Sequence, residues 1–199
     1  MSDVRIGAVG RGRPRETSHD EIRDAARDLF AARGFDNVSM AQIADALGIG
    51  RTTLYAYFPN KRDLMWEEFD ERAAEMRASF VSDEAGGLLE DMRGAIRILA
   101  RFSRAEHAAF AQRQRIMRES DDLRAHAALR TSELAQQLVR LGQERAPSVD
   151  AGYVGDLTHA LMAVAARAID EWASLRAPDE DLDAYVDGRI GTFLELAAS

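Results

Sequence analysis

The sequence contains no cysteine, and histidine occurs only four times in its 199 residues. Without thiols the chain can form neither disulfide bonds nor thiolate metal sites, and it has no cysteine nucleophile. The histidines are dispersed, with no His-x-x-x-His or His-Glu-x-x-His spacing. A serine in a Gly-x-Ser-x-Gly turn and a glycine-rich phosphate loop are missing as well. These absences predict a protein that is not an enzyme and that binds no metal ion and no cofactor.

Proline and long apolar runs are also scarce. Only four prolines occur, and no apolar run approaches the ~18 residues that a membrane span needs. Residues 1–15 are polar, glycine-rich and basic, unlike a secretory signal. We therefore expect a cytoplasmic protein with no membrane contact. Between the prolines apolar residues recur at helical spacing, and no stretch alternates like a strand. The predicted fold is all-α, with about nine helices.

Helix boundaries follow from capping signals. Ser18 with Glu21, and Ser39 with Gln42, each have the spacing of a capping box at a helix start. Glycines and loop-forming clusters mark the ends. The helices are expected from Ser18 to Gly34, Ser39 to Gly48, Arg51 to about Tyr57 and Asn60 or Lys61 to about Val81, and then over 88–103, 105–119, 122–145, 150–176 and 179–197.

The charge of the chain is unevenly distributed. The formal net charge is −8, which by itself argues against binding to DNA phosphates. Residues 1–64, however, carry ten basic and nine acidic side chains, whereas residues 65–199 carry sixteen basic and twenty-five acidic ones. Only the N-terminal part is therefore electrostatically suited to DNA.

The segment 40–58 meets the steric demands of a helix-turn-helix. Gly48 lies where the chain must bend sharply, and Ala44 is small where the two helices would cross. A shared apolar core is supplied by Ile43, Leu47, Ile49, Leu54 and Phe58. The side chains left at the start or on the outer face of the second helix, which can reach a major groove, are Arg51, Thr52, Thr53, Tyr55 and Tyr57.

This run resembles the TetR family of regulators. The family pattern is a small helix ending in leucine-glycine, a recognition helix reading roughly Thr-Leu-Tyr-x-Tyr/His-Phe, and then x-x-Lys-x-x-Leu. The chain has Thr-Leu-Tyr-Ala-Tyr-Phe at 53–58 and Lys-Arg-Asp-Leu at 61–64, and the resemblance covers about Ser18 to Leu64. Gly50 and Ala56 depart from it, since relatives often have a capping serine and a longer side chain at these places.

The resemblance implies roles for individual residues. Arg51 and Thr52 would read base edges, because an arginine can pair bidentately with guanine. Tyr55 and Tyr57 would contact phosphate or a thymine methyl, and Lys61 would hold phosphate. Ser39 joins this predicted surface because backbone N–H groups at a helix start suit phosphate. The alternative for the two tyrosines is simple packing.

Upstream, three arginines in Arg-Gly-Arg-Pro-Arg resemble the core of an AT-hook. Arg11, Arg13 and Arg15 could enter an A·T-rich minor groove, as flexible arms do. They could equally form a basic tail that adds only non-specific affinity. Both interpretations stay open, and we treat residues 1–17 as a flexible basic arm, 18–64 as the DNA-binding domain and 65–199 as a helical effector-binding and dimerisation domain.

The C-terminal part offers apolar side chains for two purposes. An effector cavity between helices could be lined by Trp66, Met92, Phe102, Phe110, Met117 and Met162, although core packing explains such a stripe equally well. Apolar stripes on the last two helices, together with the TetR resemblance, predict a dimer interface that includes Leu157, Leu161, Ala168, Trp172, Tyr185, Ile190 and Phe193. The alternative is the core of the same subunit, which part of each stripe must serve in any case. The segment around Trp172 also resembles the C-terminal domains of mycofactocin-type regulators.

Together these features predict a one-component transcriptional regulator of the TetR type. As a homodimer it would bind a near-palindromic double-stranded DNA operator as a repressor, and an unidentified apolar or amphipathic small molecule would release it. The alternative is an all-α ligand-carrying or interaction protein that keeps a vestigial helix-turn-helix.

Overall fold

The computed structural model describes residues 17–80 and 87–199. Within these residues it contains nine α-helices, one 3₁₀ turn and no strand, which confirms the all-α prediction. The helices are α1 (His19–Arg33), α2 (Met40–Leu47), α3 (Arg51–Tyr57), α4 (Asp63–Ser79), α5 (Leu88–Leu99), α6 (His107–Glu119), α7 (Asp121–Arg145), α8 (Ala151–Ser174) and α9 (Leu182–Ala197), with the turn η1 (Arg104–Glu106) before α6.

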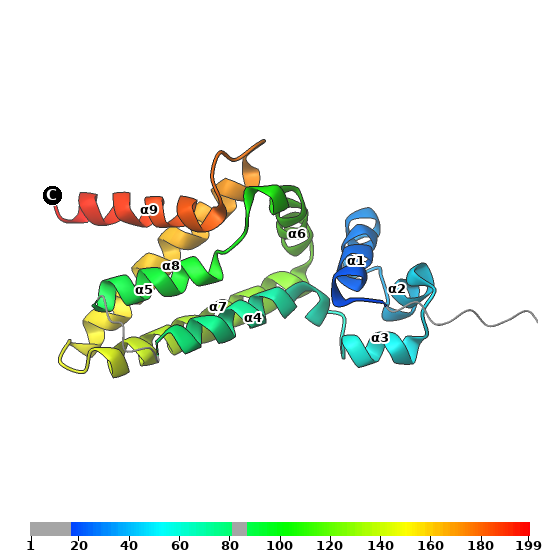
Figure 1. The fold of residues 1–199 in the computed structure, drawn as a ribbon, viewed down its shortest axis with the longest axis horizontal. Coiled ribbons are helices and arrows are strands. Elements are labelled where there is room, and N and C mark those ends of the chain that lie inside the picture. The colour runs from blue at the N-terminus through cyan, green and yellow to red at the C-terminus, as the bar shows by residue number, and fades with distance from the viewer. Residues whose placement is uncertain (1–16, 81–86) are drawn as a thin grey trace, which may run out of the picture.

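The first three helices form a small unit at one end of the molecule (Figure 1). Both expected capping boxes are present, because the hydroxyls of Ser18 and Ser39 accept the N–H of Glu21 and Gln42. Gly34 ends α1 with φ +82°, and its N–H donates to Phe30 O. These local signals set where each helix starts and stops.

The core of this N-terminal unit is not closed by α1 to α3 alone. Ile22, Phe30 and Leu54 are at most 1% exposed, and the same buried cluster includes Leu64, Met65 and Trp66 of α4 together with Ile116 of α6 and Leu123 of α7. The expected division between residues 64 and 65 therefore falls inside α4 and inside one continuous core. A displacement of α4 or α6 would therefore change the packing of the first three helices.

Helices α5 to α9 pack around a second core. α8 packs along α9 and against α7, and α5 contacts α4, α7, α8 and α9. Trp172, Leu161 and Ile190 are fully buried there. Figure 1 shows α4 leaving the N-terminal unit toward this C-terminal unit, and α6 standing between the two.

Several boundaries differ from the sequence expectation by a few residues, and two of these differences have a cause in the tertiary structure. α5 ends at Leu99 instead of 103, because the chain turns there so that Phe102 O accepts the N–H of Leu182 at 2.9 Å. α9 starts at Leu182 instead of 179, and the indole N–H of Trp172 donates to Glu180 O in the preceding loop at 3.1 Å. The first contact joins distant segments and the second joins residues eight apart, and helical periodicity contains neither.

Candidate DNA-binding surface and ligand cavity

The helix α3 presents a row of polar side chains to solvent. Arg51, Thr52 and Thr53 are exposed in its first turn, and Tyr55 is 50% exposed. Leu54 is 0% exposed and anchors the helix in the N-terminal core. A short helix anchored on one side with Arg, Thr and Tyr on the other has the form of a recognition helix that enters a major groove.

The turn before α3 has the geometry that the sequence predicted. Gly48 adopts φ +66° and ψ +27°, a left-handed conformation that side chains with a Cβ rarely take. Its N–H donates toward the carbonyls of Ala44 and Asp45, which closes α2. Ala44 and Ile43 are both 0% exposed, so the small residue does lie in the packed interior.

The remaining predicted DNA contacts have less freedom. Tyr57 is half-buried, with its ring 4.8 Å from that of His19 in an edge-to-face arrangement. The hydroxyl of Ser39 lies 3.1 Å from Gln42 Oε1 and accepts the Gln42 N–H, so it is occupied in capping α2. Arg11, Arg13 and Arg15 lie outside the described residues.

Lys61 has a structural task that sequence reasoning missed. Its Nζ donates to Phe35 O at 2.8 Å and to Val38 O at 3.0 Å, and it lies 4.1 Å from the centroid of the Phe35 ring. Burial lowers the pKa of this ammonium, partly offset by Asp36. Lys61 therefore ties the loop between α1 and α2 to the start of α4, and one of its three N–H donors is left for the predicted phosphate contact.

A cavity of about 380 Å³ lies inside the C-terminal unit. Its size falls within the range of small-molecule sites. Five of the six residues expected to line it do so, namely Trp66, Phe102, Phe110, Met117 and Met162. The other apolar side chains of its wall are Phe69, Ile96, Leu99, Ala100, Ala127, Leu134, Leu138, Ala165, Ala166, Ile169 and Leu182.

Met92 is the exception, and the expectation for it was wrong. It is 1% exposed and is not part of the cavity wall. Its Sδ lies 4.0 Å from the hydroxyl of Thr158, and its Cε lies 2.2 Å from where a Cβ on Gly142 would stand. The absence of a side chain on Gly142 lets Met92 pack against α7, away from the open space.

A few charged groups interrupt the apolar wall. Arg72, Arg113, Arg130 and Asp170 line the cavity with Gln114 and Thr131. Arg113 donates two N–H groups to Met65 O, at 3.0 and 2.9 Å, and burial lowers its pKa to about 10. The guanidinium of Arg72 stacks 3.7 Å from the centroid of the Phe102 ring. An apolar chamber with guanidinium groups at its edge suits an amphipathic ligand.

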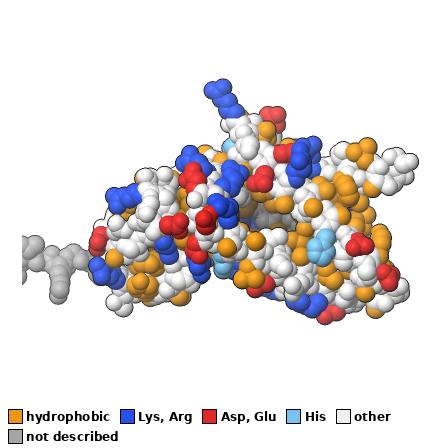
Figure 2. Space-filling view, turned by 180° about the vertical axis from the view of Figure 1, so that it is seen from behind, with side chains coloured by type: hydrophobic (Ala, Val, Ile, Leu, Met, Phe, Trp, Pro, Cys, Tyr) orange, Lys and Arg blue, Asp and Glu red, His pale blue; other side chains and the backbone are white. Residues whose placement is uncertain are grey.

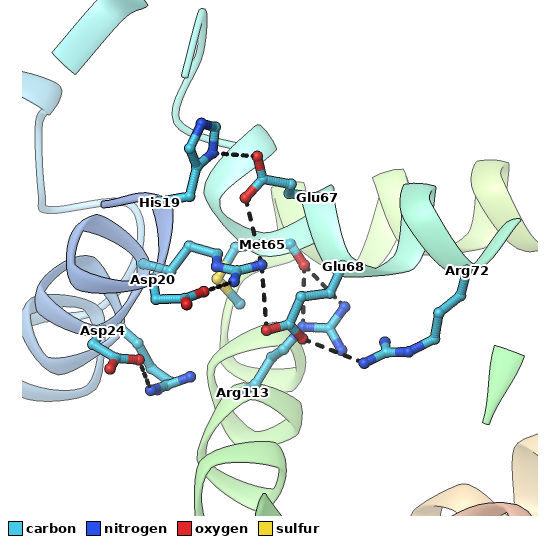
Figure 3. A network of polar contacts seen from close by, with 10 residues as sticks. His19, Asp20, Asp24, Met65, Glu67, Glu68, Arg72 and Arg113 are labelled. Carbon is cyan, nitrogen blue, oxygen red and sulfur yellow. Dashed lines mark hydrogen bonds and ion pairs between the residues drawn. The ribbon is translucent and has the colours of Figure 1, made fainter. Parts of the chain in front are cut away.

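Arg72 also belongs to a set of charged side chains where α1, α4 and α6 meet (Figure 3). We call this set the seam, and its members are His19, Arg23, Glu67, Glu68 and Arg72. Glu68 lies between Arg72 and Arg23, and Glu67 lies between Arg23 and His19. Figure 2, which views the molecule from behind, shows positive and negative side chains intermingled where the two units meet and hydrophobic ones around the neighbouring hollow. Charged contacts thus join α1 to Arg72 in the cavity wall.

The predicted dimer interface is corrected at four positions. Leu161, Trp172 and Ile190 are 0% exposed and Ala168 is 1% exposed, so they pack within their own subunit and cannot reach a partner. These four residues form the part of each stripe that serves the core of its own subunit, which is the alternative that the sequence left open. Leu157 and Tyr185 are half-buried, and Phe193 is 37% exposed. The exposed apolar side chains of α8 and α9 also include Leu196, which belongs to the predicted stripe and is 72% exposed, and Tyr153, which sequence reasoning missed and which is 58% exposed.

Comparison with known proteins identifies the family of the chain. Residues 22–67 match the family model described as "Bacterial regulatory proteins, tetR family", and residues 87–194, more than half of the chain, match the one described as "MftR C-terminal domain". The chain belongs to the TetR family of transcriptional regulators.

Similar curated proteins are regulators as well. One from Mycobacterium tuberculosis (strain ATCC 25618 / H37Rv), assigned as a mycofactocin biosynthesis transcriptional regulator, MftR, is 32% identical over 117 residues, which is 58% of this chain and 59% of the relative. The repressor BdcR of Escherichia coli (strain K12) is 45% identical over 53 residues, or 27% of each chain. The matched stretch thus spans no more than 59% of these relatives' own length.

Solved TetR-family structures share the fold over nearly the whole chain. A regulator from Syntrophomonas wolfei aligns with a TM-score of 0.60 at 18% identity, covering 91% of this chain and 95% of its own. FadR from Bacillus subtilis, solved in complex with stearoyl-CoA, aligns with a TM-score of 0.58 at 20% identity, covering 87% and 96%.

Other residues of this TetR-family chain fill structural roles that the sequence did not reveal. The Nε2–H of His107 donates to Trp172 O at 3.0 Å, and His126 packs edge-on against Trp66. In the parts of the chain that the structure describes, no group of three or more His, Asp or Glu side chains could hold a metal ion. Among the described helices, none is both long and apolar enough to cross a membrane.

Proposed function

We propose that this chain is a one-component repressor that binds a near-palindromic operator as a homodimer and is released by a small amphipathic molecule. The observation that carries the proposal is the pairing of an anchored, outward-facing recognition helix with an apolar cavity of about 380 Å³ on the far side of α4. A carrier needs the cavity alone, whereas a regulator needs both.

DNA recognition would centre on α3. Arg51 can pair bidentately with a guanine, Thr52 and Thr53 can bond base edges or phosphate, and Tyr55 can contact phosphate or a thymine methyl. Their exposure supports this assignment, because none is required by the core. Tyr57, Ser39 and the last N–H of Lys61 would contribute positioning contacts at the edge of the surface.

Dimerisation would use the outer face of α8 and α9. Tyr153, Phe193 and Leu196 expose large apolar surface there, and Gly188 has no neighbouring side chain within 4 Å of an added Cβ. Two copies related by a two-fold axis would bury this face as a four-helix bundle. The two recognition helices could then occupy successive major grooves about 34 to 36 Å apart.

The effector would be held by the cavity. Its walls favour a long apolar body, and Arg72 and Arg113 favour a polar or anionic end. Stearoyl-CoA in FadR of Bacillus subtilis shows that this fold can hold a ligand of amphipathic character. A ligand with higher affinity for the DNA-free arrangement would shift the population toward it and release the operator.

The decisive test is binding to the DNA upstream of the chain's own gene. A fluorescent duplex from that region should bind the wild-type protein with an affinity that falls as salt rises. Arg51→Ala and Tyr55→Ala should each weaken binding by about 5- to 150-fold, as loss of a base contact of about 1 to 3 kcal/mol implies. Both variants should remain helical by circular dichroism and unchanged in oligomeric state.

A matched control is Arg176→Ala, which removes an exposed arginine from the loop between α8 and α9. It should leave DNA affinity within about twofold, because Arg176 lies in the loop between α8 and α9 and not on the surface proposed to contact DNA. If wild-type protein shows no salt-dependent binding, or if the α3 variants bind like the control, the chain is instead a ligand-carrying or interaction protein with a vestigial helix-turn-helix.

A further inference from the structure

Two neighbouring glutamates of α4 connect the cavity wall to the DNA-binding unit. Glu68 Oε2 lies 3.8 Å from Arg72 Nη2, and its other oxygen lies 3.4 Å from Arg23 Nη1 of α1. Glu67 Oε2 lies 3.4 Å from the same Arg23 nitrogen, and Glu67 Oε1 lies 2.5 Å from His19 Nδ1. One guanidinium nitrogen of Arg23 is therefore shared between two carboxylates of α4.

The seam is partly removed from water. Side-chain exposure is 17% for Arg23 and Arg72, 22% for Glu67 and 34% for Glu68. Charges at this depth are weakly screened, and removing one partner leaves the others uncompensated. The orientation of α1 relative to α4 should therefore depend on every member of the set.

The contacts of Arg23 with the two glutamates of α4 are loose, whereas its other terminal nitrogen, Nη2, donates to Asp20 of its own helix in a close ion pair. Separations of 3.4 Å exceed the 2.7 to 2.9 Å typical of a charge-assisted hydrogen bond. Arg23 Nη1 and Glu67 Oε2 are both buried, and neither has a hydrogen-bond partner. A displacement of roughly half an ångström would convert these contacts into hydrogen bonds. A closed arrangement of these contacts is therefore only a small displacement away from the observed one.

The two ends of this set reach the two functional sites. Arg72 lines the cavity and stacks on Phe102, so a ligand in the cavity touches the guanidinium that holds Glu68. At the other end the ring of His19 packs 4.8 Å from Tyr57 of the recognition helix. Figure 3 shows the carboxylates of Glu67 and Glu68 lying between His19 on one side and Arg72 on the other.

We infer that His19, Arg23, Glu67, Glu68 and Arg72 form a charged relay through which cavity occupancy sets the position of the DNA-binding unit. This inference rests on the proposed function. A ligand that engages Arg72 withdraws it from Glu68, and the freed carboxylate closes on Arg23. α1 is then pulled against α4, and His19 carries the displacement to Tyr57. Arg72 and Glu68 are positioning residues in this scheme, since neither touches DNA.

A double-mutant cycle with operator affinity as its readout tests the relay in the full-length dimer. Arg72→Gln mimics occupancy by freeing Glu68, so it should weaken binding to the upstream duplex by about 2- to 30-fold, the usual range for coupling residues. In a Glu68→Gln background the same Arg72 substitution should change affinity by less than about twofold. Arg72→Lys, which keeps the charge beside Glu68, should restore most of the affinity.

The matched control is the exposed pair of Arg101 and Glu75, which joins α4 to the segment after α5 at 2.8 Å. Arg101→Gln and Glu75→Gln should leave affinity within about twofold, alone and together. Additive effects of Arg72→Gln and Glu68→Gln in folded variants, or no effect of Arg72→Gln, would overturn the relay while leaving the proposed function intact. Failure of the wild-type protein to bind DNA would overturn both.

Discussion

The N-terminal and C-terminal units are both helical, but they use their interiors in opposite ways. In the N-terminal unit Ile22, Ile43, Ala44 and Leu54 are all 0% exposed, and the groups suited to function lie on the outside of α3. The C-terminal unit surrounds a cavity of about 380 Å³ with side chains from six helices. A tight core presents a surface rigidly, whereas a hollow core can respond to what fills it.

The largest expected effect on stability comes from enlarging one buried alanine in the N-terminal unit, compared with enlarging one alanine of the cavity wall. Ala44→Leu adds three carbons where the side chain is 0% exposed, and overpacking should lower the free energy of unfolding by about 1 to 3 kcal/mol. Ala165→Leu adds the same atoms to the cavity wall and should change it by less than about 0.5 kcal/mol. Urea unfolding of the two variants measures both values. Equal losses would mean that the cavity cannot accommodate the three added carbons.

The contrast also explains what the sequence could predict. The capping boxes at Ser18 and Ser39 and the left-handed turn at Gly48 depend on residues close together in the chain, so spacing alone identified them. The bonds from Lys61 to Phe35 O and Val38 O join segments more than twenty residues apart. No local pattern distinguishes a lysine that holds phosphate from one that holds carbonyls.

The cavity and the dimer face were predicted only in part for a related reason. Apolar periodicity identifies which face of a helix is buried, but not what it is buried against. Trp172 and Leu161 belong to a correctly identified stripe on α8, yet their neighbours lie in the same subunit. Glu67 and Glu68 gave no signal at all, because a pair of glutamates on a helix is usually a solvated face.

A smaller change in stability is expected from two glycines of the C-terminal unit, one with open space around it and one in a tightly packed place. Gly94 and Gly142 lie in the helices α5 and α7, but a Cβ at Gly94 would meet nothing within 4 Å, whereas one at Gly142 would meet Met92 Cε at 2.2 Å. Gly94→Ala should raise the free energy of unfolding by about 0.5 to 1 kcal/mol through helix propensity. Gly142→Ala should lower it by about 1 kcal/mol, since the displacement of Met92 outweighs the propensity gain.

Thermal unfolding of the two glycine variants checks the sign of each change. A stabilised Gly142→Ala would show that Met92 repacks freely, and the space around it would then have to be counted as an extension of the cavity. A destabilised Gly94→Ala would contradict the open surroundings of that residue.

The smallest predicted effect is a difference in pH dependence between two capping boxes, one from each unit. Ser39 in the N-terminal unit faces the amide of Gln42, whereas Ser103 before α6 donates its N–H and hydroxyl to the carboxylate of Glu106 at 2.9 and 2.7 Å. The hydrogen bond from the Ser103 hydroxyl holds the pKa of Glu106 below its ordinary value. Because that pKa is lowered in the folded state, its stabilising contribution is full above the unfolded pKa and is lost as pH falls through the folded one.

Ser39→Ala and Ser103→Ala should therefore behave alike at neutral pH and differently in acid. Each should lower the free energy of unfolding by about 0.5 to 2 kcal/mol near neutrality. As pH falls below the ordinary glutamate value of about 4.3, the loss in Ser103→Ala should shrink, because the protonated Glu106 no longer accepts a charge-assisted bond. The loss in Ser39→Ala should stay constant, since Gln42 does not titrate. Urea unfolding of the wild-type protein and both variants, at neutral pH and below the ordinary glutamate pKa, gives the four losses. A Ser103→Ala loss that is unchanged in acid would show that the carboxylate charge contributes nothing to the cap.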